Sequence, residues 1–246
     1  MKIDIVTSIP LQGYKLFAEE NYKKFLQHWP KDIKLHLFSE DKLSIKESDI
    51  NYYDLYKLSP ECKKFVDNNK NRKWNPPYRQ KLYKQLFIKF CFKVYAICLA
   101  SRIIDTDILI WLDSDIKTVA DLPVDLITKN IDAGTVLCYL NRDKSPRNTN
   151  KSKSVSTETG LILFNMRNQT TKEFFARYQE LYDSNKIFDM DEVHDAFVFD
   201  RLIEQMESEG LGEFKKLTNG THDFPLPKTE FGKYLVHDMG KKKWKL

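Results

Sequence analysis

Two aspartates separated by one residue follow an unbroken apolar stretch of the sequence. Residues 107–112 read Asp-Ile-Leu-Ile-Trp-Leu, and Asp113 and Asp115 come directly after them. A continuous apolar run is typical of a buried strand, and open α/β sheets bind ligands beyond the carboxyl ends of such strands. Two neighbouring carboxylates repel unless they share a cation, so the pair predicts a divalent metal site. A turn acid followed by a helix N-cap is the alternative for this pattern.

The closing segment of the chain carries a second spacing of interest. His237, Gly240 and Lys243 are each three residues apart, and Trp244 follows. This segment resembles the closing His-x-x-Gly-x-x-Lys-Pro-Trp signature of retaining family-8 glycosyltransferases, the group of glycogenin and the lipopolysaccharide galactosyltransferases, although the proline is missing here. The resemblance implies that His237 joins the two aspartates on Mn²⁺ or Mg²⁺. It also implies that Gly240 lets the backbone approach the phosphates and that Lys243 neutralises the charge of the leaving diphosphate.

The donor set fits that implication. Two carboxylates and one imidazole suit Mn²⁺ better than Mg²⁺, and such an ion can bridge both phosphates as they gain negative charge. For His237 taken alone, an ordinary surface histidine is the alternative.

An internal stretch resembles the strand that touches the donor sugar in the same family, and more closely in small phage and bacterial glycosyltransferases. It reads Glu158-Thr159-Gly160. The resemblance places Thr159 and Gly160 in the nucleotide-sugar site and makes Glu158 a catalytic candidate. Gly160 lets a ligand approach the backbone, and Glu158 could accept hydrogen bonds from sugar or acceptor hydroxyls.

A further stretch stands where that family carries Asp-Gln-Asp-x-x-Asn near the anomeric carbon. Here Asp195 matches, while His194 replaces the glutamine and Val198 the asparagine. The resemblance gives Asp195 three candidate roles: orienting the sugar, stabilising an oxocarbenium-like transition state, or acting as a base if the enzyme inverts. A helix N-cap is the alternative for Asp195.

The remaining predicted nucleotide-sugar-binding residues are scattered over the first half of the chain. By the same resemblance, Thr7 and Ser8 contact the base or ribose, with main-chain turn bonding as the alternative. Arg79 could clamp a phosphate bidentately, and Lys93 would act as a point charge. Trp111, in the strand before the acids, completes the set.

The elements that must position these residues alternate between strands and helices. Apolar periodicity predicts strands at 2–8, 33–38, 107–112, 131–140 and 160–165, and helices around 17–29 and at 80–101, 171–182 and 195–206. Residues 57–79 are predicted to form a loop, 141–157 a mobile basic loop, and the part after 220 an irregular tail. The pattern predicts one α/β domain over 1–246, with a mixed sheet flanked by helices, and the resemblance implies that this domain has a GT-A fold. Residues 1–121 would form its nucleotide half and 122–246 its acceptor half.

Composition limits the other possibilities. The chain has 246 residues, of which 41% are hydrophobic, and this is enough to form one core. Its net charge of +5 permits an anionic partner. The longest apolar run, 94–100, is far below the roughly 20 residues of a membrane span. The N-terminus lacks the pattern of a signal peptide, and the four cysteines lack metal-type pairing, so we expect reduced thiols and a cytoplasmic protein, in the host cytoplasm if phage-encoded.

These observations predict a metal-dependent glycosyltransferase. By the resemblance, it would move a sugar from a nucleoside diphosphate sugar, with a UDP-sugar favoured, to an acceptor hydroxyl. Retention of configuration is favoured because the closing signature resembles that of a retaining family. The basic loop and positive charge permit a hydroxymethylated base of phage DNA as acceptor; a glycan, lipid or protein fits the same residues. A nucleotidyltransferase is one alternative, although residues 7–10 do not form its Gly-rich basic loop. A non-catalytic sugar-nucleotide-binding module is the other.

Overall fold

A seven-stranded sheet forms the centre of the protein in the computed structural model. The structure describes residues 1–41, 50–73, 86–142, 157–218 and 224–237. The strand order is β3-β2-β1-β4-β7-β6-β8. Strand β7 is antiparallel to both of its neighbours, and the other pairings in this sheet are parallel. The strands are β1 (Ile3–Ile9), β2 (Lys34–Ser39), β3 (Ile50–Asp54), β4 (Ile108–Leu112), β6 (Thr135–Asn141), β7 (Thr157–Asn165) and β8 (Glu213–Lys216).

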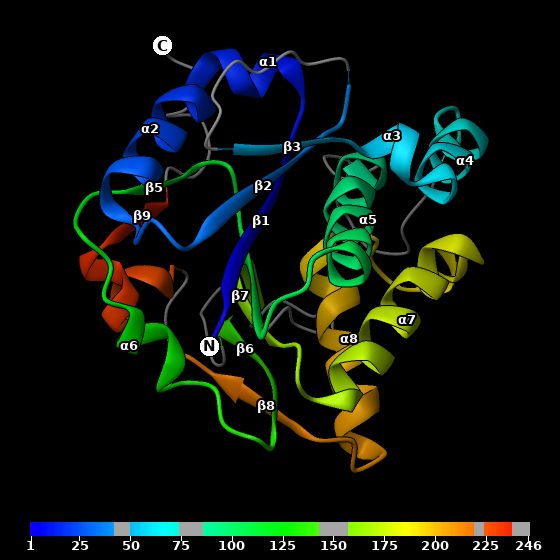
Figure 1. Ribbon diagram of the computed structural model, residues 1–246. Coiled ribbons are helices and arrows are strands. Elements are labelled where there is room, and N and C mark those ends of the chain that lie inside the picture. The colour runs from blue at the N-terminus through cyan, green and yellow to red at the C-terminus, as the bar shows by residue number, and fades with distance from the viewer. Residues whose placement is uncertain (42–49, 74–85, 143–156, 219–223, 238–246) are drawn as a thin grey trace.

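Helices cover both faces of this sheet (Figure 1). One face carries α3 (Leu55–Leu58), α4 (Pro60–Asn69), α5 (Leu86–Ile103), α7 (Gln169–Asp183) and α8 (Asp195–Ser208). The other carries α1 (Leu11–Gly13), a π-helical turn (Tyr14–Ala18), α2 (Glu19–His28) and α6 (Val124–Thr128). The mixed α/β domain with flanking helices that the sequence predicts is confirmed.

The apolar strands form because each contributes to two cores. In β4, Leu109 and Trp111 pack into the core under α5, α7 and α8, whereas Ile108 and Ile110 pack into the core on the opposite face. All five residues of β4 are buried. A strand covered on both faces needs apolar side chains in both directions, which explains the continuous run in the sequence.

The strand order creates one topological switch point. From β1 the chain proceeds outward to β2 and β3, and β4 then pairs with the other side of β1. Because β7 is antiparallel to β4, its first residues lie at the carboxyl end of β4, where Leu112 pairs with Leu161. The backbone N–H of Asp113 donates to the carbonyl of Gly160 at 2.8 Å. The crevice at such a switch point is the usual ligand site of an open α/β sheet.

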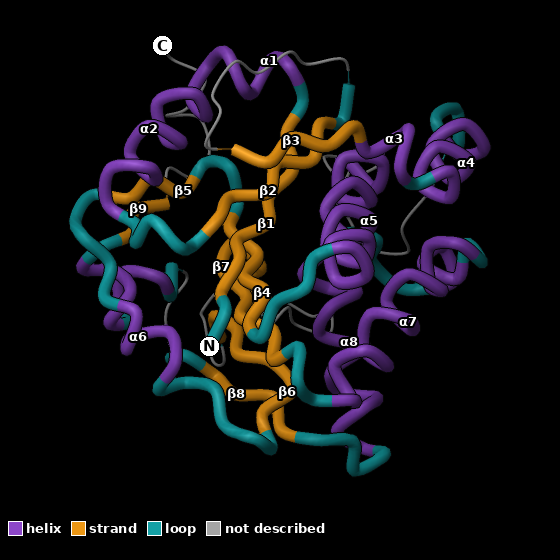
Figure 2. Tube along the Cα trace, in the orientation of Figure 1, coloured by secondary structure: helices purple, strands orange, loops and turns teal. Residues whose placement is uncertain are grey.

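A separate two-stranded ribbon joins the end of the described chain to this edge (Figure 2). Strands β5 (Ile116–Thr118) and β9 (Leu235–His237) are antiparallel, and Ile116 pairs with His237. Strand β5 begins at the residue that follows Asp115, so the pairing of Ile116 with His237 places His237 beside that aspartate.

Several local predictions need correction. The prediction of a loop over 57–79 is wrong, because α4 lies within this range. Ser59 caps α4 by accepting a hydrogen bond from the N–H of Cys62, and Pro60 occupies the first helical position. Polar residues dominate this helix, and few side chains, such as Phe65, face the core. The tail predicted as irregular contains two 3₁₀ turns (Leu226–Lys228 and Glu230–Lys233) and β9. Residues 74–85, and thus the predicted start of the long helix, lie outside the described residues.

Within the part of the chain that the structure describes, no helix combines the length and apolarity that crossing a membrane requires. Cys62, Cys91, Cys98 and Cys138 are all buried free thiols.

Candidate active site

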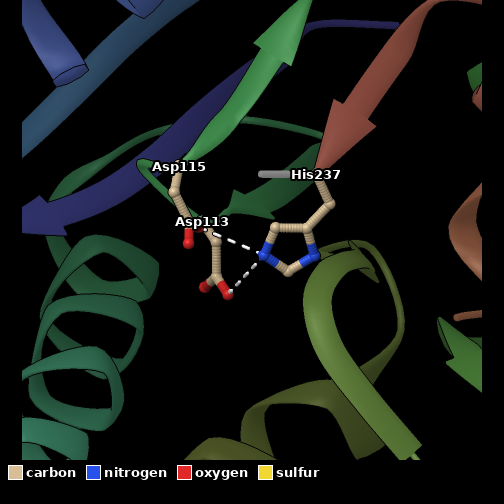
Figure 3. Close-up of side chains that lie close together, drawn as sticks. All are labelled: Asp113, Asp115 and His237. Carbon is tan, nitrogen blue, oxygen red and sulfur yellow. Dashed lines mark hydrogen bonds and ion pairs between the residues drawn. The ribbon is translucent and has the colours of Figure 1, made fainter. Parts of the chain in front are cut away.

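Asp113, Asp115 and His237 converge at the carboxyl edge of β4 (Figure 3). Nε2 of His237 lies 3.2 Å from Oδ1 of Asp115 and 4.0 Å from Oδ2 of Asp113. One possible ligand atom from each residue lies within 4.8 Å of the others. Two carboxylate oxygens and one imidazole nitrogen at these separations suit a single divalent ion. The convergence that the sequence predicted across 122 residues is present in the fold.

Local structure fixes the two aspartates. The N–H of Ile116 donates to the carbonyl of Asp113 at 2.9 Å, which closes a tight turn between β4 and β5. The indole N–H of Trp111 donates to Oδ1 of Asp113 at 2.6 Å. The side chain of Trp111 is itself buried. Its hydrogen bond therefore comes from a ring that packing holds in place, and it orients Asp113.

His237 is held from behind by Glu158. Nδ1 of His237 donates to Oε1 of Glu158 at 2.8 Å, which leaves Nε2 directed at the aspartates. Burial acts to lower the pKa of His237, but the hydrogen bonds to Asp115 and Glu158 outweigh it and raise the pKa to about 10. Burial likewise acts to raise the pKa of Glu158, yet its hydrogen bond to His237 contributes to a net lowering. A bound cation would take the place of the imidazolium proton among these acids.

Lys93 connects Asp113, Asp115 and His237, which together we call the metal-type cluster, to a further acid. Its ammonium lies 3.0 Å from Oδ1 of Asp113 and 2.8 Å from Oδ2 of Asp195, and it donates to the carbonyl of Thr159 at 2.7 Å. Burial acts to lower the pKa of Lys93, but the two carboxylates together outweigh it and raise the pKa. The phosphate contact expected of Lys93 stays a prediction, while its described partners are two acids and Thr159.

Asp195 is held ionised within this cluster. Its Oδ2 accepts from the hydroxyl of Thr159 at 2.6 Å as well as from Lys93. Burial acts to raise the pKa of Asp195, but Lys93 overrides that effect and holds it at about 2. The alternative that Asp195 is an N-cap is wrong, because it is the first residue of α8 and His194 is the cap.

His194 has its ring nitrogens engaged by neighbours in the chain. Nδ1 accepts from the N–H of Phe197 at 3.3 Å, and Nε2 lies 2.7 Å from Oε2 of Glu192. The predicted contact of His194 with a nucleotide sugar would therefore require these contacts to change.

Gly160 makes room for His237. A Cβ built on Gly160 would lie 3.0 Å from Cε1 and 3.2 Å from Nδ1 of His237. In this structure the space over the glycine is thus occupied by a candidate metal ligand, whereas the sequence predicted an approaching sugar nucleotide.

We expect the substitution Gly160→Ala to weaken Mn²⁺ binding by about 10-fold or more, because a displaced imidazole loses its ligand geometry. Isothermal titration with MnCl₂ measures this. Gly134→Ala is the matched control, since the nearest atom to its Cβ is Oδ1 of Asp132 at 3.6 Å. Equal Mn²⁺ affinity in the two variants would contradict the steric role of Gly160.

The other predicted site residues divide into two groups. Thr7 is buried in β1, and the hydroxyl of Ser8 donates to Oε1 of Glu40 at 2.9 Å rather than to the main chain. Burial raises the pKa of Glu40 to about 7. Arg79, Gly240 and Lys243 lie outside the described residues.

Comparison with known proteins bears on the fold. No protein-family model and no curated protein matches the sequence. Mouse xyloside xylosyltransferase 1 superposes with a TM-score of 0.52 at 13% identity, over 87% of this chain and 85% of the mouse protein. The galactosyltransferase LgtC, in complex with donor and acceptor sugar analogs, gives 0.53 at 13% identity, over 97% of this chain and 87% of LgtC. This chain has the GT-A glycosyltransferase fold.

A third GT-A structure is larger than this chain. GlyE from Streptococcus pneumoniae TIGR4 superposes with a TM-score of 0.53 at 16% identity, over all of this chain but 56% of GlyE. The chain therefore spans little more than half the length of that GT-A protein.

Arg142 contacts the site through Glu158, and the sequence analysis did not predict this contact. Nη2 of Arg142 lies 3.1 Å from Oε2 of Glu158, on the side away from His237. The residue was read as part of a basic loop, because nothing in its local pattern marks the pairing of Asn141 with Thr157 that brings it to Glu158.

Proposed function

We propose that this protein is a metal-dependent glycosyltransferase that moves a sugar from a nucleoside diphosphate sugar to an acceptor hydroxyl. The observation that carries the proposal is the convergence of Asp113, Asp115 and His237 at the switch-point edge of a GT-A fold. A carboxylate pair and an imidazole at that edge can hold a cation against a diphosphate.

The donor set favours Mn²⁺, with Mg²⁺ as the other candidate cofactor. When bound, the ion would neutralise the charge that develops on the leaving diphosphate. The residues of this chain would hold it: Asp113 and Asp115 supply oxygens, and His237 supplies Nε2. Trp111 and Lys93 keep Asp113 in place through contacts of 2.6 and 3.0 Å.

Asp195 is joined to Asp113 of the metal-type cluster through Lys93. Its carboxylate is kept ionised by Lys93, and an ionised carboxylate stabilises an oxocarbenium-like transition state. We favour retention of configuration, because the closing segment around His237 resembles that of a retaining family. In support, burial acts to raise the pKa of Asp195 but Lys93 holds it at about 2, which makes this carboxylate a weak base toward an acceptor hydroxyl.

The finer assignments are part of the same proposal. A UDP-sugar is the favoured donor, and residues 1–121 would bind it, with 122–246 forming the acceptor half in a cytoplasmic enzyme. The acceptor is a hydroxyl of a glycan, lipid or protein, or of hydroxymethylated phage DNA. Within the described residues nothing favours DNA, and the basic loop that suggested it is undescribed from 143 to 156.

A thermal-shift titration of the wild-type protein tests the proposal. With Mn²⁺ present, UDP at about 100 times its dissociation constant should add about 2.7 kcal/mol of stability, which corresponds to a rise in melting temperature of about 5–10 °C. With a chelator in place of Mn²⁺, UDP should produce little or no shift. Equal shifts with and without Mn²⁺ would refute the metal assignment.

Product analysis separates the alternative functions. A glycosyltransferase incubated with Mn²⁺ and a UDP-sugar should slowly release UDP and free sugar by transfer to water. A nucleotidyltransferase would release pyrophosphate from a nucleoside triphosphate instead. A non-catalytic module would show the thermal shift without any release of UDP.

A further inference from the structure

A line of three side chains runs from the metal-type cluster to the end of β6. His237 contacts Glu158, and Glu158 contacts Arg142. We propose that Glu158 and Arg142 are positioning residues that orient His237 as a metal ligand, rather than residues that touch the sugar. This inference rests on the proposed function, because it concerns the same metal site.

Both carboxylate oxygens of Glu158 are already used. Oε1 accepts from Nδ1 of His237 at 2.8 Å, and Oε2 accepts from Nη2 of Arg142 at 3.1 Å. The side chain of Glu158 is only 5% exposed. A sugar hydroxyl would have to displace one of these partners to reach it, which argues against the direct substrate contact that the sequence suggested.

The contact with Nδ1 decides which ring nitrogen can bind a cation. When Nδ1 carries a hydrogen and donates it to a carboxylate, the lone pair of a neutral imidazole stands on Nε2. Nε2 is the atom that faces Asp113 and Asp115. A carboxylate behind a metal-bound histidine also fixes the ring plane and makes the nitrogen a better ligand.

The sheet explains why Arg142 can restrain Glu158. Leu140 pairs with Glu158 and Asn141 with Thr157 across the β6–β7 ladder, so Arg142 follows directly on the strand beside Glu158. The charge-assisted hydrogen bond from Nη2 of Arg142 restrains Oε2 of Glu158. Arg142 therefore keeps Oε1 turned toward His237 and opposes rotation of this buried acid toward a cation.

Electron paramagnetic resonance of free Mn²⁺ provides a test that does not depend on turnover. Titrations would compare wild type with Glu158→Gln, Glu158→Ala, Arg142→Gln and Arg142→Lys, each checked for folding by circular dichroism. We expect Glu158→Ala to weaken Mn²⁺ binding by about 10–100-fold, the usual loss when the partner behind a metal-bound histidine is removed. Glu158→Gln and Arg142→Gln should weaken it by about 3–10-fold, because an acceptor remains but its orientation is lost.

Conservative and distant variants make the test specific. Arg142→Lys should recover part of the affinity lost in Arg142→Gln, since it restores a cation beside Oε2 of Glu158. Arg167→Gln is the matched control, because Arg167 also pairs with an acid, Asp107, but at the opposite end of β4. Its Mn²⁺ affinity should equal that of wild type.

The outcomes distinguish this inference from the proposed function. If wild type binds Mn²⁺ and all four variants bind it equally well, the positioning roles are overturned while the metal site survives. Unchanged Mn²⁺ affinity with a raised KM for the UDP-sugar in Glu158→Gln would return Glu158 to substrate contact. If wild type itself fails to bind Mn²⁺, the proposed function and this inference both fall.

Discussion

Replacing His237 by alanine is expected to weaken Mn²⁺-dependent UDP binding by at least about 100-fold, since loss of a ligand should cost no less than loss of a residue that only supports one. The variant keeps both aspartates but removes the imidazole between Asp115 and Glu158. Two acids without that nitrogen hold a cation less tightly and less rigidly. Isothermal titration of UDP in excess Mn²⁺ measures the change directly.

His28→Ala is the control for this prediction. His28 also pairs with an aspartate, with 2.7 Å between Nδ1 and Oδ1 of Asp121, but His28 is the last residue of α2 and Asp121 is exposed at the surface. Its removal should leave UDP binding unchanged. The metal assignment would fail if His237→Ala and His28→Ala bound UDP with the same affinity in Mn²⁺.

The acids of the site could be predicted from the sequence because their signal is local. An apolar run that ends in Asp113 and Asp115 indicates both a buried strand and its carboxyl edge. The tail histidine needed more than the local pattern. Strand β9 has only three residues, and it exists because it pairs with β5. Its position was predicted from a resemblance and not from periodicity.

The contacts between the predicted residues could not be read from the sequence. Lys93 and Glu158 were each expected to contact a ligand. In the structure, Lys93 contacts Asp113 and Asp195 instead. Glu158 contacts His237 and Arg142. Such pairings depend on the order of β4, β7 and β6 in the sheet and on the helix that covers it. A charged residue marks a candidate site from its type alone, but its partner is fixed by tertiary structure.

The substitution Lys93→Met tests that tertiary cluster. Lys93 is buried and lies between Asp113 and Asp195. Its replacement by an apolar side chain leaves two neighbouring acids without their common cation. Removing one partner of a buried ionic group typically costs about 3–5 kcal/mol, and we expect a loss of this size in the free energy of unfolding, measured with urea.

A second lysine in the same arrangement supplies the control. Lys215 also lies between two acids, Asp132 and Glu213, but at the surface. Lys215→Met should therefore cost no more than about 1 kcal/mol. The double variant Lys93→Met, Asp195→Asn should recover part of the lost stability, because the amide can still accept from Thr159 and only Asp113 is left uncompensated. Equal losses for the two lysine variants would mean that the ionic cluster at the site is solvated and that Lys93 is not what holds Asp195 ionised.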